Sequence, residues 1–252
     1  DVDFVLYGYM NRGVREGYCG VCVYHYSNDQ NVVEEKVFIP STESYEFLQG
    51  DFGTLSYVSS DNYLFLLFAQ KLYKIDISQG TSEILEEGIQ SESFCVSDTN
   101  AHAAWVIQDG ESAGDIKEID FETLETRMLA PSDGQSLSML GFMNEDLVYG
   151  IVVDGDIVTD ENGHETTGIH TTRIEGFDGT LKKEYHRDNL YITAVTMGST
   201  MMEFQLSKKS AKGYKVVNKD NILNNTKASA STVSVELVSN SRTGTQVRLA
   251  FE

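Results

Sequence analysis

Three cysteines are the first candidates for chemistry, because Cys19 and Cys22 are separated by two residues. This spacing occurs in redox centres and in zinc sites. A thioredoxin-type pair stands at the start of a helix, whereas this pair leads into a segment with strand character. A zinc site would need ligands such as His25, Cys95 or His102, but no second pair of Cys or His has ligand spacing. The sequence therefore favours buried thiols or one disulfide, and we predict no metal and no cofactor.

An acidic segment at residues 154–165 is the second candidate, since it begins Asp154-Gly155-Asp156 and also contains Asp160. A calcium loop of the EF-hand type needs oxygen ligands at alternate positions and a glycine at the sixth position. In this segment Val158 occupies a ligand position, and the glycine stands at the tenth position. The segment is therefore predicted to be a solvated hairpin between two strands.

Hydrolytic chemistry would need two carboxylates that face one pocket, or a nucleophile beside a histidine. The chain has 39 Asp and Glu residues, so the sequence does not identify which of them converge. Asp146, at the start of an expected strand, is one candidate. Neither the Gly-x-Ser-x-Gly nucleophile motif nor the Gly-x-x-x-x-Gly-Lys-Ser/Thr phosphate loop is present. We therefore predict no catalytic residue.

Tyrosines are concentrated near the N-terminus, at positions 7, 9, 18, 24 and 26. Alternate residues of a strand share a face, so Tyr7 lies with Tyr9, and Tyr24 lies with Tyr26. Such rows can line a surface that binds carbohydrate or peptide, and they can also pack one sheet against the next. The sequence leaves both interpretations open.

The overall charge limits the class of partner. The 252 residues include 19 Lys and Arg and 39 Asp and Glu, which gives a net charge of −20. A surface this acidic repels phosphate, so binding to nucleic acid or to anionic lipid is not expected. No apolar run reaches the length of about 18 residues that a membrane span requires, and the sequence starts with Asp1-Val2-Asp3, so we expect neither a membrane span nor a signal peptide within these residues. The hydrophobic fraction of 40% is sufficient for a packed core.

The elements that would position these residues read as strands. Short runs of Val, Ile, Tyr, Phe and Thr recur along the chain, and Gly, Asn, Asp or Ser bounds each run. Helical periodicity is limited to short stretches at residues 44–48 and 83–88, which would make a turn or two. We therefore predict an all-β protein.

Internal repeats refine this prediction. Residues 71–85 align with residues 115–129 at an offset of 44, and a looser third copy covers residues 170–181. Before the first two copies, turns rich in Ser, Asp and Asn at 59–62 and 97–100 join two strands, and such residues tolerate left-handed backbone. The unit is four strands in about 40–55 residues, which is the length of a β-propeller blade.

We predict that residues 1–252 form a single β-propeller with five blades of four antiparallel strands. The strands of blades two to five are expected at 54–58, 63–68, 72–77 and 82–85; at 93–97, 103–107, 116–121 and 126–129; at 139–143, 146–153, 169–175 and 180–185; and at 191–197, 201–207, 214–218 and 233–238. The first blade would combine strands at 4–9, 21–26 and 32–39 with the C-terminal strand at 246–251, which would close the ring. A ring of four or six units and an open array of sheets are the alternatives.

Two resemblances support this interpretation. The turn Val-Ser-Ser-Asp-Asn at 58–62 and the strand Leu-Tyr-Lys-Ile-Asp at 72–76 resemble blades of TolB-like β-propellers. Residues 17–24, 38–40, 141–150 and 183–185 are similar to a region of large, uncharacterised, membrane-anchored extracellular proteins of anaerobic Gram-positive bacteria. The second resemblance implies a fragment of a longer chain at the cell surface, tethered by an anchor outside this fragment and flanked by further domains. It implies no functional residue.

The sequence thus favours a non-catalytic extracellular module that binds or scaffolds a protein or a glycan. Two long loops between strands, at residues 11–20 and 154–168, are the expected places of partner contact. The predicted contact residues are Arg12, Arg15, Tyr18, Asp154, Asp156 and Asp160. The alternative function is a hydrolase that acts on glycans, with its carboxylates in the central channel of the ring.

Overall fold

The structure is a computed structural model that describes residues 1–52, 54–111, 114–159, 165–198, 201–210, 213–224, 233–240 and 244–251. It is an all-β fold, as predicted, with one α-helix, α1 (Tyr45–Phe52), among the described residues. The helix includes most of the stretch 44–48 that shows helical periodicity. The stretch 83–88 lies mostly in strand β7 (Thr81–Glu87), where pairing with the neighbouring strand outweighs a weak local pattern. No helix in the described ranges is long and apolar enough to cross a membrane.

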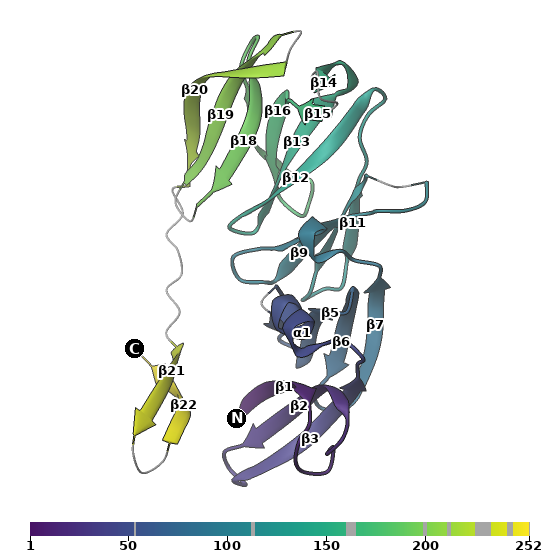
Figure 1. The fold of residues 1–252 in the computed structure, drawn as a ribbon, viewed down its shortest axis with the longest axis vertical. Helices are drawn as coiled ribbons and strands as arrows, with labels where there is room; N and C mark the ends of the chain where they lie inside the picture. The colour runs from purple at the N-terminus through teal and green to yellow at the C-terminus, as the bar shows by residue number, and fades with distance from the viewer. Residues whose placement is uncertain are drawn as a thin grey trace.

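Five antiparallel sheets follow one another in sequence order along an open arc (Figure 1). The first has β1 (Val2–Tyr9), β2 (Cys19–Ser27) and β3 (Val32–Pro40), and the second has β4 (Ser56–Val58), β5 (Tyr63–Phe68), β6 (Lys71–Asp76) and β7. The third has β8 (Phe94–Val96), β9 (His102–Val106), β10 (Ile116–Asp120) and β11 (Thr126–Leu129). The fourth has β12 (Gln135–Met143), β13 (Asp146–Val153), β16 (Thr171–Glu175) and β17 (Leu181–His186). The fifth has β18 (Tyr191–Met197), β19 (Met201–Ser210) and β20 (Gly213–Leu223).

Two hairpins stand outside these sheets. One pairs β14 (Ile157–Thr159) with β15 (Glu165–Thr167), within the segment predicted to be a hairpin. The other pairs β21 (Val233–Asn240) with β22 (Gly244–Phe251). Two single-turn 3-10 helices, η1 (Ser91–Ser93) and η2 (Asp154–Asp156), lie in loops.

The predicted closure of the ring is wrong, because the sheets do not form a closed propeller. The C-terminal strand pairs with β21, which we expected in the fifth blade, and the first sheet keeps three strands. Chain entropy accounts for the difference, since the loss of entropy on loop closure grows with loop length. A hairpin between adjacent segments therefore forms at lower cost than a pairing between the two ends of the chain. The second, third and fourth sheets each have four antiparallel strands, as predicted for the blades.

Successive sheets pack face to face, and the alternation of the strands supplies both faces. Strand β5 shows this most clearly: Leu64 and Leu66 belong to the apolar cluster shared with the first sheet, while Phe65 and Leu67 belong to the cluster shared with the third. Further clusters join the third sheet to the fourth and the fourth to the fifth. Each inner sheet is thus apolar on both faces, which explains why its central strand is a continuous apolar run.

The repeated turns adopt the predicted backbone conformation. Asn62, Asn100 and Asn144 have φ values of 63°, 62° and 56°, and each stands in the turn between the first two strands of its sheet. Asparagine tolerates this left-handed region better than most residues do. At the next turn of the repeat, Gly80 and Leu124 are 44 residues apart and both have positive φ, at 67° and 61°.

Replacing Gly80 with alanine is expected to destabilise the protein more than the same change at Gly88. Both glycines have positive φ, so each substitution carries a backbone cost of about 1–2 kcal/mol. A Cβ at position 80 would also lie 2.8 Å from the carbonyl oxygen of Lys36, while nothing lies within 4 Å at position 88. The extra contact should increase the loss in free energy of unfolding by about 1–3 kcal/mol, as measured by urea titration. Equal losses for the two variants would contradict this explanation, and Gly155→Ala, which has neither constraint, is the neutral control.

Candidate functional site

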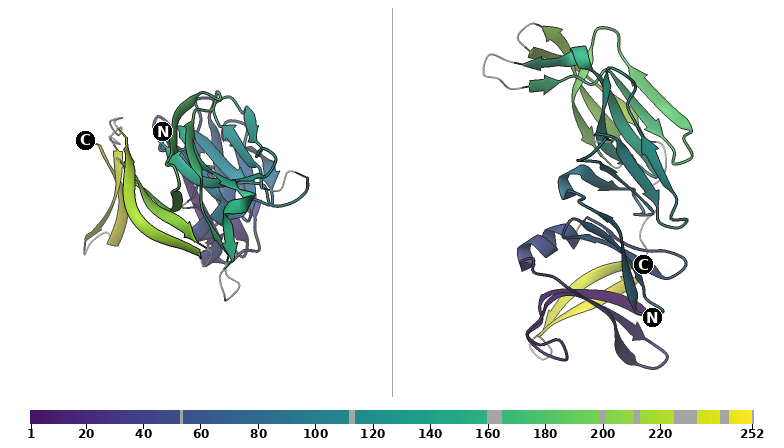
Figure 2. Two further views of the ribbon diagram at one scale, coloured as in Figure 1. Left: turned by 90° about the horizontal axis from the view of Figure 1, so that it is seen from above. Right: turned by 90° about the vertical axis from the view of Figure 1, so that its right-hand side faces the viewer.

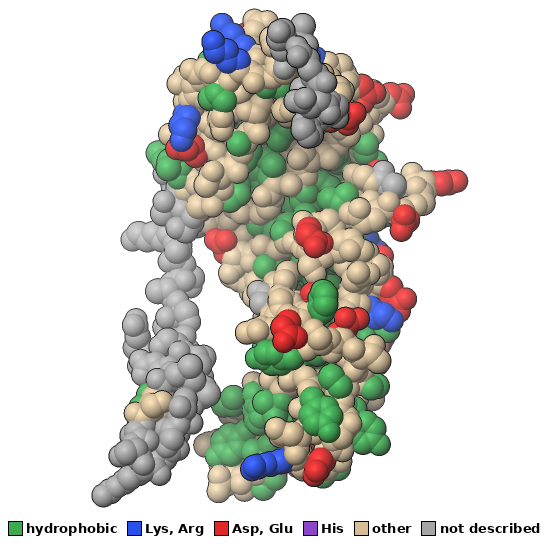
Figure 3. Space-filling model, in the orientation of Figure 1, with side chains coloured by type: hydrophobic (Ala, Val, Ile, Leu, Met, Phe, Trp, Pro, Cys, Tyr) green, Lys and Arg blue, Asp and Glu red, His purple; other side chains and the backbone are tan. Residues whose placement is uncertain are grey.

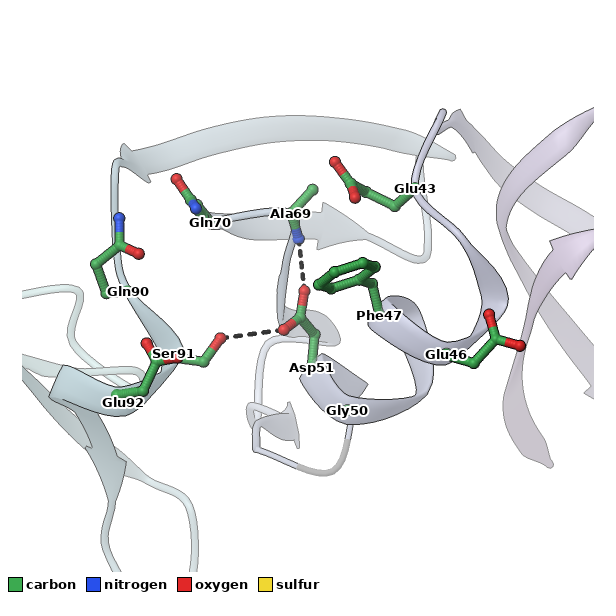
Figure 4. A pocket seen from close by; sticks show the side chains of 10 residues that line it. All are labelled: Glu43, Glu46, Phe47, Gly50, Asp51, Ala69, Gln70, Gln90, Ser91 and Glu92. Atoms are coloured by element: carbon green, nitrogen blue, oxygen red, sulfur yellow. Dashed lines mark hydrogen bonds between the residues drawn. The ribbon is translucent and has the colours of Figure 1, made fainter.

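A cavity of about 560 Å³ lies between α1 and the loops at the edge of the second sheet (Figure 4). Three stretches of chain that are distant in sequence, 43–51, 69–70 and 90–92, form its walls. Its lining residues are Glu43, Glu46, Phe47, Gly50, Asp51, Ala69, Gln70, Gln90, Ser91 and Glu92. The cavity therefore depends on how α1 is held against the sheets.

Two residues of α1 hold the helix in place. Leu48 is fully buried in the apolar cluster between the first and second sheets. Tyr45 stacks on Tyr7 of β1, with ring centroids 5.6 Å apart. Leu48 is thus directed to the core, whereas Phe47 remains 69% exposed and points to the cavity (Figure 4). An exposed phenylalanine ring is a surface on which a ligand can pack.

Asp51 ties the three walls of the cavity together. Its carboxylate accepts a hydrogen bond of 2.8 Å from the backbone N–H of Ala69 and one of 3.0 Å from the hydroxyl of Ser91 (Figure 4). Ala69 and Gln70 form the two-residue turn between β5 and β6, and both have positive φ, at 49° and 58°. Turns of this kind usually contain Asn and Gly, so the bond from Asp51 helps to hold an unfavourable turn sequence.

The cavity is acidic, and its charged lining residues are all carboxylates. Four carboxylates line it, and hydrogen bonds from its own backbone N–H and from Ser44 lower the pKa of Glu46. The ten lining residues include no His, Cys, Lys or Arg, and the hydroxyl of Ser91 is already bonded to Asp51. A serine hydrolase needs a base beside the hydroxyl. The arrangement can attract a cation, and its lining does not contain the serine–histidine pair of a serine hydrolase.

The predicted contact residues near the N-terminus lie in the loop between β1 and β2. Arg15 donates two hydrogen bonds to Glu35, of 2.9 and 2.6 Å, and its guanidinium lies 4.6 Å from the ring centroid of Phe38. The ring of Tyr18 meets Phe38 edge-on at 6.1 Å. Arg12 is exposed. Arg15 and Tyr18 thus contact the same ring, that of Phe38, but the guanidinium of Arg15 is already paired with the carboxylate of Glu35.

The predicted acidic contacts are divided between the interior and the surface. Asp156 is buried, and one of its carboxylate oxygens lies 3.1 Å from the ammonium of Lys209 in β19. Its carbonyl accepts a hydrogen bond from the hydroxyl of Tyr214 in β20. Asp156 therefore connects η2 to the fifth sheet. Asp154 is exposed, and Asp160 lies outside the described residues.

The three cysteines are free thiols, so the alternative of a disulfide is wrong. Cys22 is fully buried, and burial raises the pKa of its thiol. Burial also raises the pKa of Cys95 to about 12, and its sulfur lies 3.5 Å from that of Met139. Thiols with raised pKa values are weak nucleophiles at neutral pH.

A buried ion triad between the third and fourth sheets was not predicted. Arg127 donates to Glu118 over 2.6 Å and to Glu175 over 2.7 Å, and the hydroxyl of Tyr149 donates to Glu175 over 2.8 Å. Burial raises the pKa of Glu118 against the opposing effect of Arg127. The signal in the sequence is the position of Glu118, two residues after the buried Ile116 in the same strand. Asp146, our candidate carboxylate, begins β13 and is not part of this triad.

The tyrosines of the first sheet pack against neighbouring rings on both of its faces. Tyr7 lies on the face toward the second sheet and stacks on Tyr45. Tyr24 stacks on Phe4, with ring centroids 5.3 Å apart, on the opposite face. Of the two interpretations of these rows, packing describes Tyr7, and Tyr24 packs on a ring of its own sheet.

Comparison with known proteins finds no matching family model and no matching curated protein. Among solved structures, the β-propeller domain of the Trilobed protease from Pyrococcus furiosus is similar, with a TM-score of 0.40 and 11% identity over 98% of this chain and 91% of that one. The tricorn protease gives a TM-score of 0.37 and 11% identity over 76% of this chain, and TolB from Acinetobacter baumannii gives 0.31 and 8% over 88%. The chain spans 22% of the tricorn protease and 55% of TolB. At these scores the similarities add nothing to the argument about function.

Proposed function

We propose that this chain is a non-catalytic binding module of an extracellular bacterial surface protein, and that it binds a basic segment of a partner protein in the cavity beside α1. The observation that carries the proposal is the exposed ring of Phe47 beside the carboxylates of Glu43, Glu46 and Glu92 in one cavity. The resemblance to membrane-anchored extracellular proteins supports the location, with tethering through another part of a longer chain.

The chemistry of the cavity favours a lysine or arginine side chain. Glu43, Glu46 and Glu92 supply negative charge, and the charge of −20 on the whole chain attracts cations over a longer range. A cation over the ring of Phe47 gains about 0.5–1 kcal/mol, and the aliphatic stem of lysine can pack on the same ring. Gln70 and Gln90 add amides that can bond to a peptide backbone.

A calorimetric titration with an acetylated hexapeptide that contains two lysines tests the proposal. We expect binding that weakens with added salt and a loss of about 5–10-fold in affinity for Phe47→Ala or Glu46→Gln. The matched controls are a peptide with norleucine in place of lysine, which should not bind, and Glu125→Gln, an exposed carboxylate in the turn between β10 and β11. Equal binding of both peptides, or unchanged affinity of the Phe47→Ala variant, would rule out this site.

The glycan hydrolase remains the alternative, although no feature of the geometry favours it. The carboxylates of Glu118 and Glu175 are both bonded to Arg127, and Glu118 is fully buried, so this pair cannot contact a sugar. The test is turnover of an oligosaccharide by the wild-type chain. If Glu43→Gln or Glu92→Gln abolishes that turnover, the chain is a hydrolase and the proposed binding function is wrong.

A further inference from the structure

A second cavity, of about 370 Å³, adjoins the cavity beside α1. Glu43 and Ala69 line both cavities, so the two have a common wall. The helix α1 lies beside β1 and β5, which places this wall at the junction of the first and second sheets (Figures 1 and 2). We refer to the two adjoining cavities together as the groove.

The two cavities differ in charge. Among the described residues, four carboxylates and no cation line the cavity beside α1. The second cavity is lined by one cation, Lys71, and by one carboxylate, Glu43 of the common wall. Figure 3 shows carboxylates and hydrophobic side chains next to one another around α1. The groove is therefore acidic at the end beside the helix and has its positive charge at the other end.

Lys71 and Tyr73, which line the second cavity, both carry hydrogen-bond donors. They are alternate residues of β6, so they share a face of the strand. Burial raises the pKa of Tyr73, and the positive charge of Lys71 acts against this rise because the ammonium lies close to the phenol. The ring of Tyr73 stacks on Phe68 with centroids 4.3 Å apart, which holds the phenol in place. An ammonium beside a hydroxyl suits a carboxylate, which accepts hydrogen bonds and carries the opposite charge.

Lys71 is available to a ligand although it already has a partner. Its ammonium pairs with Glu87 of β7 at 3.0 Å, where the two side chains are 37% and 61% exposed. Exposed pairs of this kind are weak, and an ammonium has three donors. A second carboxylate can therefore bind to Lys71 without displacing Glu87.

We propose that the groove binds an extended peptide that carries both charges, with a lysine or arginine side chain in the cavity beside α1 and an aspartate or glutamate side chain in the second cavity. Side chains two residues apart on an extended peptide point to the same side and lie about 7 Å apart, which suits two cavities with a common wall. This pairing rests on the binding function proposed above and adds the acidic half of the recognised motif. The order of the two charges fixes the direction in which the peptide binds.

Calorimetry with acetylated and amidated peptides tests this pairing. Each peptide has one lysine and, two or three positions before or after it, either a glutamate or a glutamine. We expect the best glutamate peptide to bind about threefold more tightly than its glutamine counterpart, because its carboxylate contacts Lys71. The charge of −20 on the chain favours the glutamine peptide at long range, so a gain from glutamate reports a local contact.

Three variants assign the gain to Lys71. Lys71→Gln should abolish the gain from glutamate and leave the affinity for the glutamine peptide unchanged. Lys74→Gln is the matched control, because Lys74 is also in β6 and also pairs with a carboxylate of β7, Glu83, but does not line either cavity. Glu87→Gln separates a direct contact from a structural role of the ion pair. It removes the partner of Lys71 and leaves the ammonium in place, so the gain should persist or increase.

Three results would overturn the pairing: no glutamate peptide that binds more tightly than its glutamine counterpart, a gain that survives in Lys71→Gln, or a gain that is lost in Glu87→Gln. If the glutamine peptides bind and lose affinity in Phe47→Ala, the proposed binding function stands and only the acidic half of the motif is wrong. If the glutamine peptides bind equally well to Phe47→Ala, the proposed function is wrong, and the pairing is wrong with it.

Discussion

Replacing Arg127 with methionine is expected to lower the free energy of unfolding by about 3–5 kcal/mol, because it leaves two carboxylates without the cation that they share. The side chain of Glu118 is 0% exposed and that of Glu175 is 16% exposed, so water cannot replace the guanidinium. One oxygen of Glu118 already lacks a hydrogen-bond partner. Loss of both bonds from Arg127 would leave Glu118 buried, charged and unpaired.

Urea titration measures this loss, and Lys219→Met is the control. Lys219 pairs with Glu203 where the two side chains are 67% and 39% exposed, so its replacement should cost less than about 1 kcal/mol. Adding Glu118→Leu to Arg127→Met should restore part of the stability, because an apolar residue removes the unpaired charge. A loss below about 1 kcal/mol in Arg127→Met would show that the triad contributes no more than a surface pair.

The pH dependence gives a separate readout of the same triad. Burial raises the pKa of Glu118, so the stability that this group contributes is complete below its ordinary pKa and is lost as pH rises through the raised value. Without Arg127 the pKa should rise further. The deficit of Arg127→Met relative to wild type should therefore shrink as the pH falls from about 7 to about 5. A deficit that grows on acidification would contradict the assignment to Glu118.

The sequence is informative wherever local pattern determines structure. The continuous apolar run of β5 predicts a strand buried on both faces, and Asn62 and Asn100 predict the left-handed turns that follow the repeat. Local pattern does not determine which strands that are distant in sequence pair with one another. The strand pattern of 246–251 is the same whether it pairs with β21 or with the first sheet, so only chain entropy separates the two outcomes.

The cavity and the triad could not be predicted for a related reason. The cavity needs Asp51 to meet Ala69 and Ser91, and these residues come from three separate loops or helices. The triad needs Arg127 of the third sheet to reach Glu175 of the fourth, over 48 positions of sequence. Strand alternation places Glu118 on the same face as Ile116, but no pattern in the sequence shows that Arg127 and Glu175 meet it, or that the three walls of the cavity come together.

Replacing Phe65 with alanine is expected to lower the free energy of unfolding by about 3–5 kcal/mol. Phe65 is fully buried between the second and third sheets, and its ring stacks on that of Phe121 with centroids 4.5 Å apart. Removal of the ring deletes its apolar contacts and leaves a cavity between two rigid sheets, which cannot close around the gap. A urea titration measures the loss, and a value near 1 kcal/mol would mean that the two sheets are loosely packed.

Double variants show whether the stack of sheets behaves as separate layers. Leu66 is adjacent to Phe65 in sequence but belongs to the cluster shared with the first sheet, so the losses of Phe65→Ala and Leu66→Ala should add to within about 0.5 kcal/mol. Phe121 is 56 positions away but shares the cluster of Phe65, so Phe65→Ala and Phe121→Ala should cost less together than the sum of their separate losses. The opposite pattern, with coupling between neighbours in sequence and none across the sheets, would mean that the strand and not the interface is the unit of stability.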